Sequence, residues 1–185
     1  AGRCEEAQIS VVVDECFIDF LPEPSEFTIE KLTERYPCLF VVQAFTKTHA
    51  IPGLRLGYGM SSDQKLLERM QQVRQPWSVS TPAQAAGLAA LRDSDRVQEA
   101  RELICRERSR MEEELRKAGV EVIPSKANFI LMYSSYDLFS LLKDRGILIR
   151  DCSNYSGLGK GWYRTAVRRR EENDRLLDAI RQICG

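Results

Sequence analysis

The sequence predicts an α/β fold in which a parallel-sheet unit is followed by a second, smaller α/β unit. Two β-branched apolar runs, at residues 9–13 and 39–45, flank a short helical segment, which is the order of a parallel βαβ unit. A long charged helix begins near Ser94, and short strands and helices alternate after it. We therefore predict two parts, residues 1–94 and residues 95–185.

The elements of the first part follow from apolar runs and from the residues that begin or end helices. In order, the expected elements are a strand over 9–13, a helix over 28–36, a strand over 39–45, a strand near 53–59, a helix over 62–73 and a helix over 83–91. Pro37 ends the first helix, Ser62 can cap the second, and Thr81 caps the third with Pro82 at its first position. The third helix is rich in small residues that suit close packing, so we expect it to be internal.

The second part begins with the charged helix, which opens at Ser94 or Asp95 and closes at Gly119. Its apolar residues are spaced by three or four, so one face of the helix is buried and the other is solvated. The elements expected after it are strands over 120–123, 129–132, 147–150 and 162–167 and helices over 138–144 and 171–183.

Composition excludes several classes of partner. Lys and Arg number 27, as do Asp and Glu, so the formal net charge is zero and there is no basic field to hold nucleic acid. No apolar run approaches the ~20 residues that span a bilayer, and the first residues lack the basic-then-apolar order of a secretory signal. We expect a cytoplasmic protein with neither a nucleic-acid nor a membrane partner.

The six cysteines are scattered without a CxxC pair, and His49 is the only histidine. Zinc-ligand spacing is therefore absent, and we expect no metal site. A chain of this length with a full apolar complement needs no disulfide to fold, so we expect reduced thiols.

Lys47 is the residue best placed for covalent chemistry. It follows an apolar strand and precedes an irregular stretch with Pro52 and Gly53, so its amine is expected to emerge at a strand end into a crevice. Desolvation lowers the pKa of a lysine and makes its amine fit to form a Schiff base. A solvated surface lysine is the alternative for any single lysine. The neighbouring residues must decide between the two.

Residues 14–20 read DECFIDF, and residues 44–58 read AFTKTHAIPGLRLGY. Together these segments resemble the signature of fold-type I pyridoxal-phosphate (PLP) enzymes of the class I/II aminotransferase group, in which an Asp-Glu strand end precedes a lysine and a Gly-Leu-Arg. The resemblance implies PLP as the cofactor. It also implies that residues 1–94 are the carboxyl-terminal part of the PLP-binding large domain and that residues 95–185 are the small carboxyl-terminal domain.

By this resemblance, Lys47 forms the Schiff base with the cofactor and Asp14 binds the ring nitrogen. A carboxylate at that place keeps the nitrogen protonated, as the cofactor requires to act as an electron sink. Thr46 and Arg55 match the positions that bind the cofactor phosphate. Phe17 stands in the cofactor site where these aminotransferases usually have a tyrosine, whose hydroxyl bonds the ring oxygen.

The departure at Phe17 points to a subfamily. Residues 14–22, 50–58, 76–79 and 149–158 resemble the L-threonine-O-3-phosphate decarboxylases of cobalamin biosynthesis. The resemblance implies a lyase that releases carbon dioxide from a small phosphorylated amino acid, L-threonine O-3-phosphate, and gives aminopropanol phosphate. Arg164 then binds the substrate carboxylate, Arg150 binds the phosphate, and Asn128 lies near the carboxylate. A turn before a strand explains Asn128 equally well.

Two alternatives stay open. Histidinol-phosphate aminotransferases share the lysine and the Gly-Leu-Arg, and the sequence does not give the substrate angle that decides whether carbon dioxide or the α-proton leaves. Members of the family are also much longer, and the resemblance begins well inside their large domain. The chain alone is therefore expected to be inactive, or to be a cofactor-free α/β module. Related enzymes are homodimers, so we expect a homodimer of the full-length form.

Overall fold

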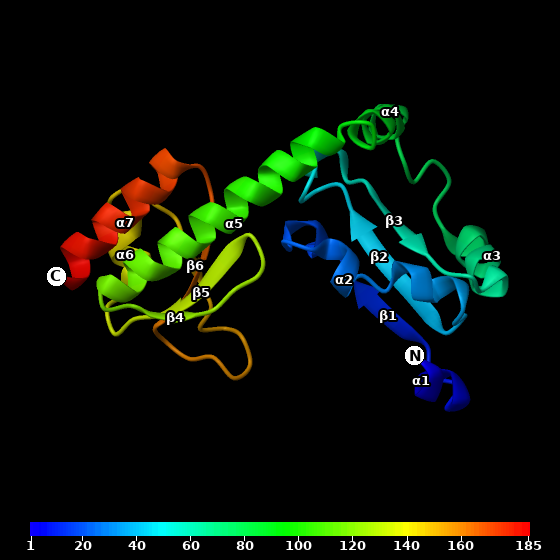
Figure 1. Ribbon diagram of the computed structural model, residues 1–185, viewed down its shortest axis with the longest axis horizontal. Helices are drawn as coiled ribbons and strands as arrows, with labels where there is room; N and C mark the ends of the chain where they lie inside the picture. Colours follow the sequence, from blue (N-terminus) through cyan, green and yellow to red (C-terminus); the bar gives the residue numbers. More distant parts are fainter. The chain divides into compact units, whose positions relative to one another are not determined.

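A computed structural model describes residues 1–185, and the chain separates into two compact units, Ala1–Glu99 and Ala100–Gly185 (Figure 1). The predicted α/β class is confirmed, because each unit combines one sheet with helices. The division lies within helix α5 (Ser94–Lys117), whose first residue is where the sequence analysis places the boundary. The assignment of the units to a large-domain part and a small domain stays a prediction.

The sheet of the first unit has three strands, β1 (Val11–Asp14), β2 (Leu39–Ala44) and β3 (Gly57–Met60), in the order β1-β2-β3. Strands β1 and β2 are parallel, with Val11 opposite Leu39, so the predicted parallel pair is confirmed. Strand β3 runs antiparallel to β2. Short helices α1 (Gly2–Glu6) and η3 (Pro52–Leu54) precede β1 and β3.

The helix predicted over 28–36 is wrong. The segment between β1 and β2 instead forms three short helical turns, η1 (Ile18–Phe20), α2 (Pro24–Phe27) and the 3₁₀ turn η2 (Glu30–Glu34). The Glu15 side chain accepts hydrogen bonds from the Thr28 hydroxyl at 2.7 Å and from the Ile29 amide at 2.8 Å. Thr28 has an extended backbone, with φ -65° and ψ 139°, so helical residues begin only at Glu30. Few residues then remain before Pro37, and they form a 3₁₀ turn.

Two helix caps differ from the prediction by one residue. Helix α3 (Gln64–Val73) is capped by Asp63, because the Ser62 hydroxyl donates to the Thr33 carbonyl instead. Helix α4 (Thr81–Ala90) is capped by Ser80, whose hydroxyl accepts from the Ala83 amide at 3.3 Å. Asp63 and Ser80, each directly before the first residue of its helix, have the extended backbone that a cap requires.

Helix α4 contacts the rest of its unit through a narrow stripe. A Cβ atom on Gly87 would lie 2.6 Å from the Leu56 side chain, so any larger residue would require the end of that leucine to move. Ala83 is buried, but Leu88 and Leu91 are 61% and 62% exposed. The expectation that the whole helix is internal is therefore wrong for these 185 residues.

The second unit combines α5 with an antiparallel sheet in the order β4-β5-β7-β6. Its remaining elements are β4 (Glu121–Ile123), β5 (Phe129–Tyr133), α6 (Leu138–Lys143), β6 (Arg150–Asp151), β7 (Trp162–Ala166) and α7 (Arg170–Cys184). The strand predicted over 147–150 is thus mostly wrong. Only Arg150 and Asp151 pair with β7, and Leu148 and Ala166 instead line a cavity.

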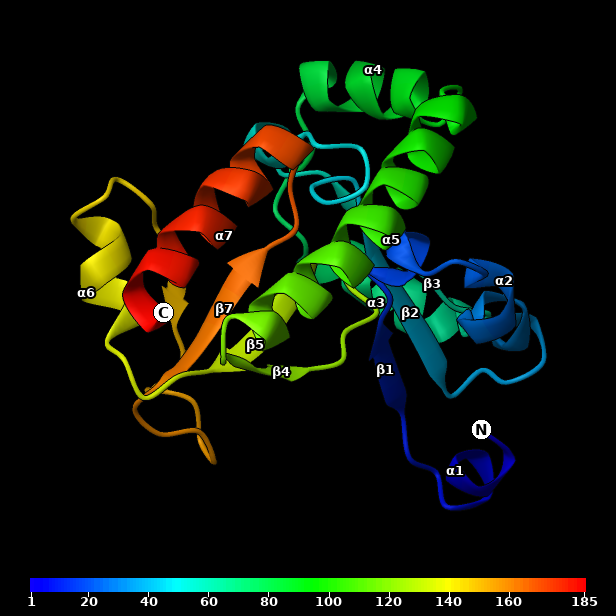
Figure 2. The ribbon, with the colours of Figure 1, turned by 60° about the vertical axis from the view of Figure 1, so that its left-hand side comes forward.

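The core of the second unit lies on one face of its sheet. Ile130 and Met132 of β5 are fully buried, as are Met111 and Leu115 of α5. Helices α5 and α7 lie side by side on this face (Figure 2) and are joined by a hydrogen bond from the Asn173 amide to Glu107 at 3.0 Å. The alternate residues of β5 and β7 point to the other face, which is only partly covered.

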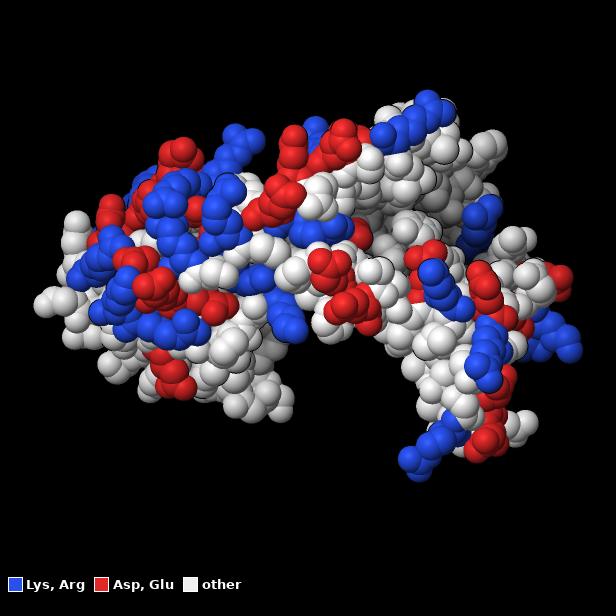
Figure 3. Space-filling model, viewed as in Figure 1, with Lys and Arg blue, Asp and Glu red and all other residues white.

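Charged side chains of both signs are interspersed on the visible surface of the second unit (Figure 3). Many form ion pairs, such as Arg110 with Asp174 at 2.7 Å and Arg181 with Glu114 at 2.6 Å. None of the helices has the length and apolar character needed to cross a membrane. All six cysteines are free thiols.

Candidate active site

The site in the first unit is built at the carboxyl ends of β1 and β2. Asp14 is the last residue of β1, and Lys47 lies three residues beyond the end of β2. Because the strands are parallel, both ends lie at the same edge of the sheet, where α/β proteins bind ligands. The Lys47 Nζ atom is 5.3 Å from the centroid of the Phe17 ring. The structure thus brings Asp14, Phe17 and Lys47 together.

The Asp14 carboxylate is held in its ionised form. Hydrogen bonds from the thiol and the backbone amide of Cys16, the latter at 2.9 Å, lower the pKa of Asp14, and the Lys47 charge lowers it further. In return, burial and the neighbouring carboxylate raise the pKa of the Cys16 thiol to about 11. Cys16 is therefore a donor to Asp14 and not a nucleophile, a role that sequence reasoning missed.

The turn that carries Lys47 is anchored by its neighbours. The Phe45 ring is buried, and the His49 ring lies 5.0 Å from it, so His49 makes a packing contact. The Thr48 side chain is 7% exposed, and its hydroxyl oxygen has no hydrogen-bond partner. Lys47 itself and Asp14 are exposed, so the expected desolvation of Lys47 is wrong for residues 1–185 alone. The reason is that β1 and β2 carry this site at an open sheet edge.

Thr46 and Arg55 lie at the two ends of one closed loop. The Phe45 amide donates to the Leu56 carbonyl at 3.2 Å. This hydrogen bond closes the loop between Thr46 and Arg55. Arg55 has φ 52° and ψ 46°, the left-handed region that costs a non-glycine residue roughly 1–2 kcal/mol. Such strain is concentrated at functional sites. The closed loop thus brings the backbone of Arg55 near that of Thr46, the residue directly before Lys47.

The candidate substrate residues lie together in the second unit. Arg150 and Arg164 are directly opposite partners of β6 and β7, so both side chains emerge on the same face of the sheet. The Arg164 guanidinium stands 4.9 Å from the Phe129 ring centroid. Arg150 donates to the Asn154 side chain at 3.3 Å. The two cationic side chains are thus neighbours on the partly covered face of the sheet.

Asn128 is held at the start of β5 by its backbone. Its carbonyl accepts from the Val167 amide at 2.8 Å. The preceding carbonyls, of Lys126 and Ala127, each accept from the buried guanidinium of Arg108 at 3.0 Å. Sequence reasoning missed Arg108. Its position, four residues after Ile104 and three before Met111, falls on the apolar face of the helix and was the available signal of burial.

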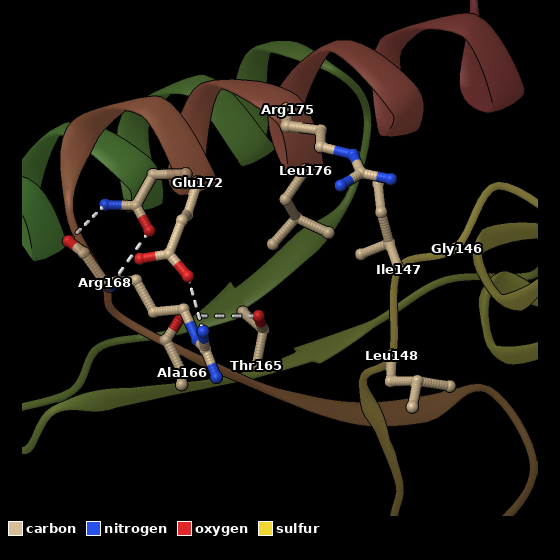
Figure 4. Close-up of a pocket in the computed structure, with 10 residues that line it drawn as sticks. Gly146, Ile147, Leu148, Thr165, Ala166, Arg168, Glu172, Arg175 and Leu176 are labelled. Carbon is tan, nitrogen blue, oxygen red and sulfur yellow. Dashed lines mark hydrogen bonds and ion pairs between the residues drawn. The ribbon is translucent and has the colours of Figure 1, made fainter.

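A cavity of about 340 Å³ in the second unit is separate from these residues (Figure 4). It is lined by the segment 146–148 and by α7, and its Arg168 is paired with Glu172. Arg175 reaches across it to the Arg145 carbonyl at 3.1 Å. Its Thr165 points to the helix side of the sheet, so the cavity does not contain Arg150 or Arg164.

Comparison with known proteins gives consistent matches over nearly all of the chain. The family model described as aminotransferase class I and II matches residues 1–180. The curated threonine-phosphate decarboxylase of Salmonella typhimurium is 39% identical over 187 residues, covering 99% of this chain and 51% of that protein. The chain spans about half the length of the curated relatives it matches.

Solved structures show the same fold. The histidinol-phosphate aminotransferase from Clostridium acetobutylicum matches with a TM-score of 0.93 and 31% identity, covering 98% of this chain and 56% of that one. The histidinol-phosphate aminotransferase from Sinorhizobium meliloti, solved in complex with pyridoxal-5'-phosphate, has a TM-score of 0.78 and 25% identity, covering 94% of this chain and 49% of that one.

Proposed function

Because the chain belongs to the aminotransferase class I and II family, we propose that it is part of a PLP-dependent decarboxylase that acts on L-threonine O-3-phosphate. The products are carbon dioxide and aminopropanol phosphate. The identity with a threonine-phosphate decarboxylase over almost the whole chain supports this substrate. The chain alone is expected to be inactive, since it spans about half of such a protein.

The residues of the first unit fit pyridoxal phosphate. Lys47 supplies a primary amine, Asp14 supplies a carboxylate that its neighbours keep ionised, and the loop of Thr46 and Arg55 supplies donors for a phosphate. When bound, the cofactor would supply an electron sink for the reaction at the substrate α-carbon. Asp14 would hold a proton on the ring nitrogen. The ring of Phe17 borders the lysine and excludes water from one side of it.

The placement of Arg150 opposite Arg164 is the observation on which the substrate proposal rests. L-threonine O-3-phosphate carries two anionic groups, a carboxylate and a phosphate, and guanidinium groups bind both in a fork geometry. Histidinol phosphate carries a phosphate and no carboxylate, and in the aminotransferase reaction the carboxylate belongs to the 2-oxo acid that binds separately. A pair of cations at one sheet position therefore matches the two anions of a single phosphorylated amino acid.

Assayed in the intact protein that contains these residues, L-threonine O-3-phosphate is expected to release one carbon dioxide per substrate without any 2-oxo acid. Release of labelled carbon dioxide measures this directly. Turnover of histidinol phosphate that depends on a 2-oxo acid acceptor would instead assign a histidinol-phosphate-type aminotransferase, which the similarity to such enzymes also allows. Absence of both activities and of PLP binding would leave a catalytically dead α/β module.

Arg150→Met is expected to raise the KM for L-threonine O-3-phosphate by roughly 10–100-fold with a smaller change in kcat, because a charge-assisted hydrogen bond contributes about 1.5–3 kcal/mol. Steady-state kinetics of the intact protein measure the split between the two constants. Arg169→Met, at an exposed arginine before α7, is the matched control and should leave both unchanged. Equal KM values for Arg150→Met and the parent protein would contradict the assignment of the phosphate to Arg150.

The homodimer, the cytoplasmic location and the place in cobalamin biosynthesis stay predictions of the resemblance. A homodimer is checked by light scattering of the intact protein.

A further inference from the structure

We propose that Glu15 is a positioning residue of the active site, which fixes the end of β1 so that Asp14 and Phe17 face Lys47. This inference rests on the proposed function for the role of Asp14 and Lys47. It concerns a buried carboxylate that is bound by Thr28, Ile29 and Gln43.

The Glu15 side chain is almost completely buried, at 5% exposure, directly after the exposed Asp14. Its carboxylate accepts three hydrogen bonds, from the Thr28 hydroxyl at 2.7 Å, the Ile29 amide at 2.8 Å and the Gln43 side chain at 3.4 Å. A buried carboxylate is tolerated only when such donors replace its hydration. The donors come from the segment before η2 and from β2, so this one side chain ties three parts of the chain together.

The backbone of Glu15 is fixed as well. Its amide donates to the Val42 carbonyl at 2.9 Å, which extends the ladder between β1 and β2 by one residue. Its carbonyl accepts from the Ile18 amide at 2.9 Å, which closes the turn that follows. Both backbone groups and both carboxylate oxygens are thus bound, and Glu15 is a fixed point between β1 and the turn.

The site residues lie on either side of this fixed point. Asp14 precedes it, and the Cys16 amide that follows it donates to the Asp14 carboxylate at 2.9 Å. Phe17 comes next and lies against Lys47. A rotation of the backbone at Glu15 would therefore move the Asp14 carboxylate, the Cys16 amide and the Phe17 ring at the same time.

The Glu15 side chain also connects the end of β1 to β2, the strand that precedes Lys47. Gln43 lies on β2, four residues before Lys47, and its side-chain oxygen accepts from the Tyr58 hydroxyl at 3.2 Å. The amide of Gln43 is thus held from both sides, by Glu15 and by β3. Glu15 therefore links the ends of β1 and β2 by a side-chain contact in addition to the sheet pairing.

Glu15→Gln tests this role with the smallest change of shape. A glutamine retains one acceptor oxygen, but its NH₂ group faces a donor where the second carboxylate oxygen was, so at least one bond is lost. In the chain of residues 1–185, the variant is expected to increase hydrogen exchange at the Cys16 amide by about tenfold or more. Carbon-13 NMR titration should show the pKa of Asp14 shifted upward toward its ordinary value.

The third measurement is the yield of the reduced PLP adduct at Lys47. The chain is incubated with PLP and reduced with borohydride, and mass spectrometry measures the yield of adduct at Lys47, which should fall in Glu15→Gln. Thr28→Val, which removes one donor and keeps the branched shape, should change all three readouts in the same direction by a smaller amount. Glu26→Gln, at an exposed carboxylate of α2, should change none of them.

The proposal fails if Glu15→Gln speeds exchange at the Ile29 amide while the Cys16 amide and the Asp14 titration stay as in the parent chain, because Glu15 then has only a structural role. Should Glu15→Gln not fold, the same comparison is made with Thr28→Val and decides the matter. Absence of any Lys47 adduct in the parent chain would count against the proposed function, whereas the exchange and titration measurements would still decide the role of Glu15.

Discussion

Lys47→Ala is expected to abolish the borohydride-trapped PLP adduct and to lower turnover by the intact protein by roughly a thousandfold or more. The reason is that Lys47 is the amine placed beside the ionised carboxylate of Asp14 and the ring of Phe17. No other side-chain type can form the same imine. The measurements are peptide mass spectrometry after reduction and the initial rate of carbon dioxide release.

Lys47→Arg separates the covalent role of this side chain from its charge. An arginine keeps a cation near Phe17 and Asp14 but stays protonated and forms no imine. We expect the pKa of Asp14 to stay low in this variant while the adduct is lost. Lys65→Ala, at an exposed lysine of α3, is the matched control and should keep the full adduct. An adduct of undiminished yield on another lysine of Lys47→Ala would refute the assignment.

The parts of this site that could be predicted from sequence are those set by strand ends. Polar residues directly after two apolar runs predict a common sheet edge, and the parallel pairing of β1 with β2 places Asp14 and the Lys47 turn there. The long helix and its end at Gly119, which has φ +78°, also follow from local signals. Each of these depends on residues close together in the chain.

The parts that could not be predicted depend on contacts between distant residues. The segment between β1 and β2 is anchored by the bonds of Glu15 to Thr28 and Ile29, and no local pattern shows where that side chain points. A charged residue directly after a strand was the available signal, but its burial depends on tertiary packing. Likewise, the opposition of Arg150 and Arg164 requires the register of β6 with β7, which neither segment contains alone.

Glu107→Ala is expected to lower the free energy of unfolding of the second unit by about 1–3 kcal/mol, the usual cost of leaving a buried hydrogen-bonding group without its partner. Glu107 is 1% exposed and accepts from Arg110 at 2.7 Å and from Asn173 at 3.0 Å. Its loss removes this acceptor from the buried Asn173 side chain at the contact between α5 and α7, while Arg110 keeps its ion pair with Asp174. Urea denaturation measures the effect, with Trp162 as reporter after Trp77, the other tryptophan, is replaced by phenylalanine.

Lowering the pH should remove part of the stabilisation that Glu107 provides. Burial raises the pKa of Glu107, but the hydrogen bonds from Arg110 and Asn173 outweigh it, so the folded-state pKa is below the ordinary value. The resulting stabilisation is present in full above the unfolded pKa of about 4.3 and is lost as the pH falls through the folded pKa. The difference in stability between the parent chain and Glu107→Gln should therefore narrow below about pH 4.3.

Glu113→Gln provides the matched control on the same helix. Its carboxylate is 66% exposed and pairs with Lys117, and exposed pairs of this kind contribute only about 0–1 kcal/mol. A comparable loss of stability in Glu113→Gln and Glu107→Ala would show that helix α5 is sensitive to any loss of negative charge. A large loss only at Glu107 would show that the buried network holds α5 against α7. That contact supports the face of the sheet opposite Arg150 and Arg164, so its rigidity sets how firmly the two cations are held.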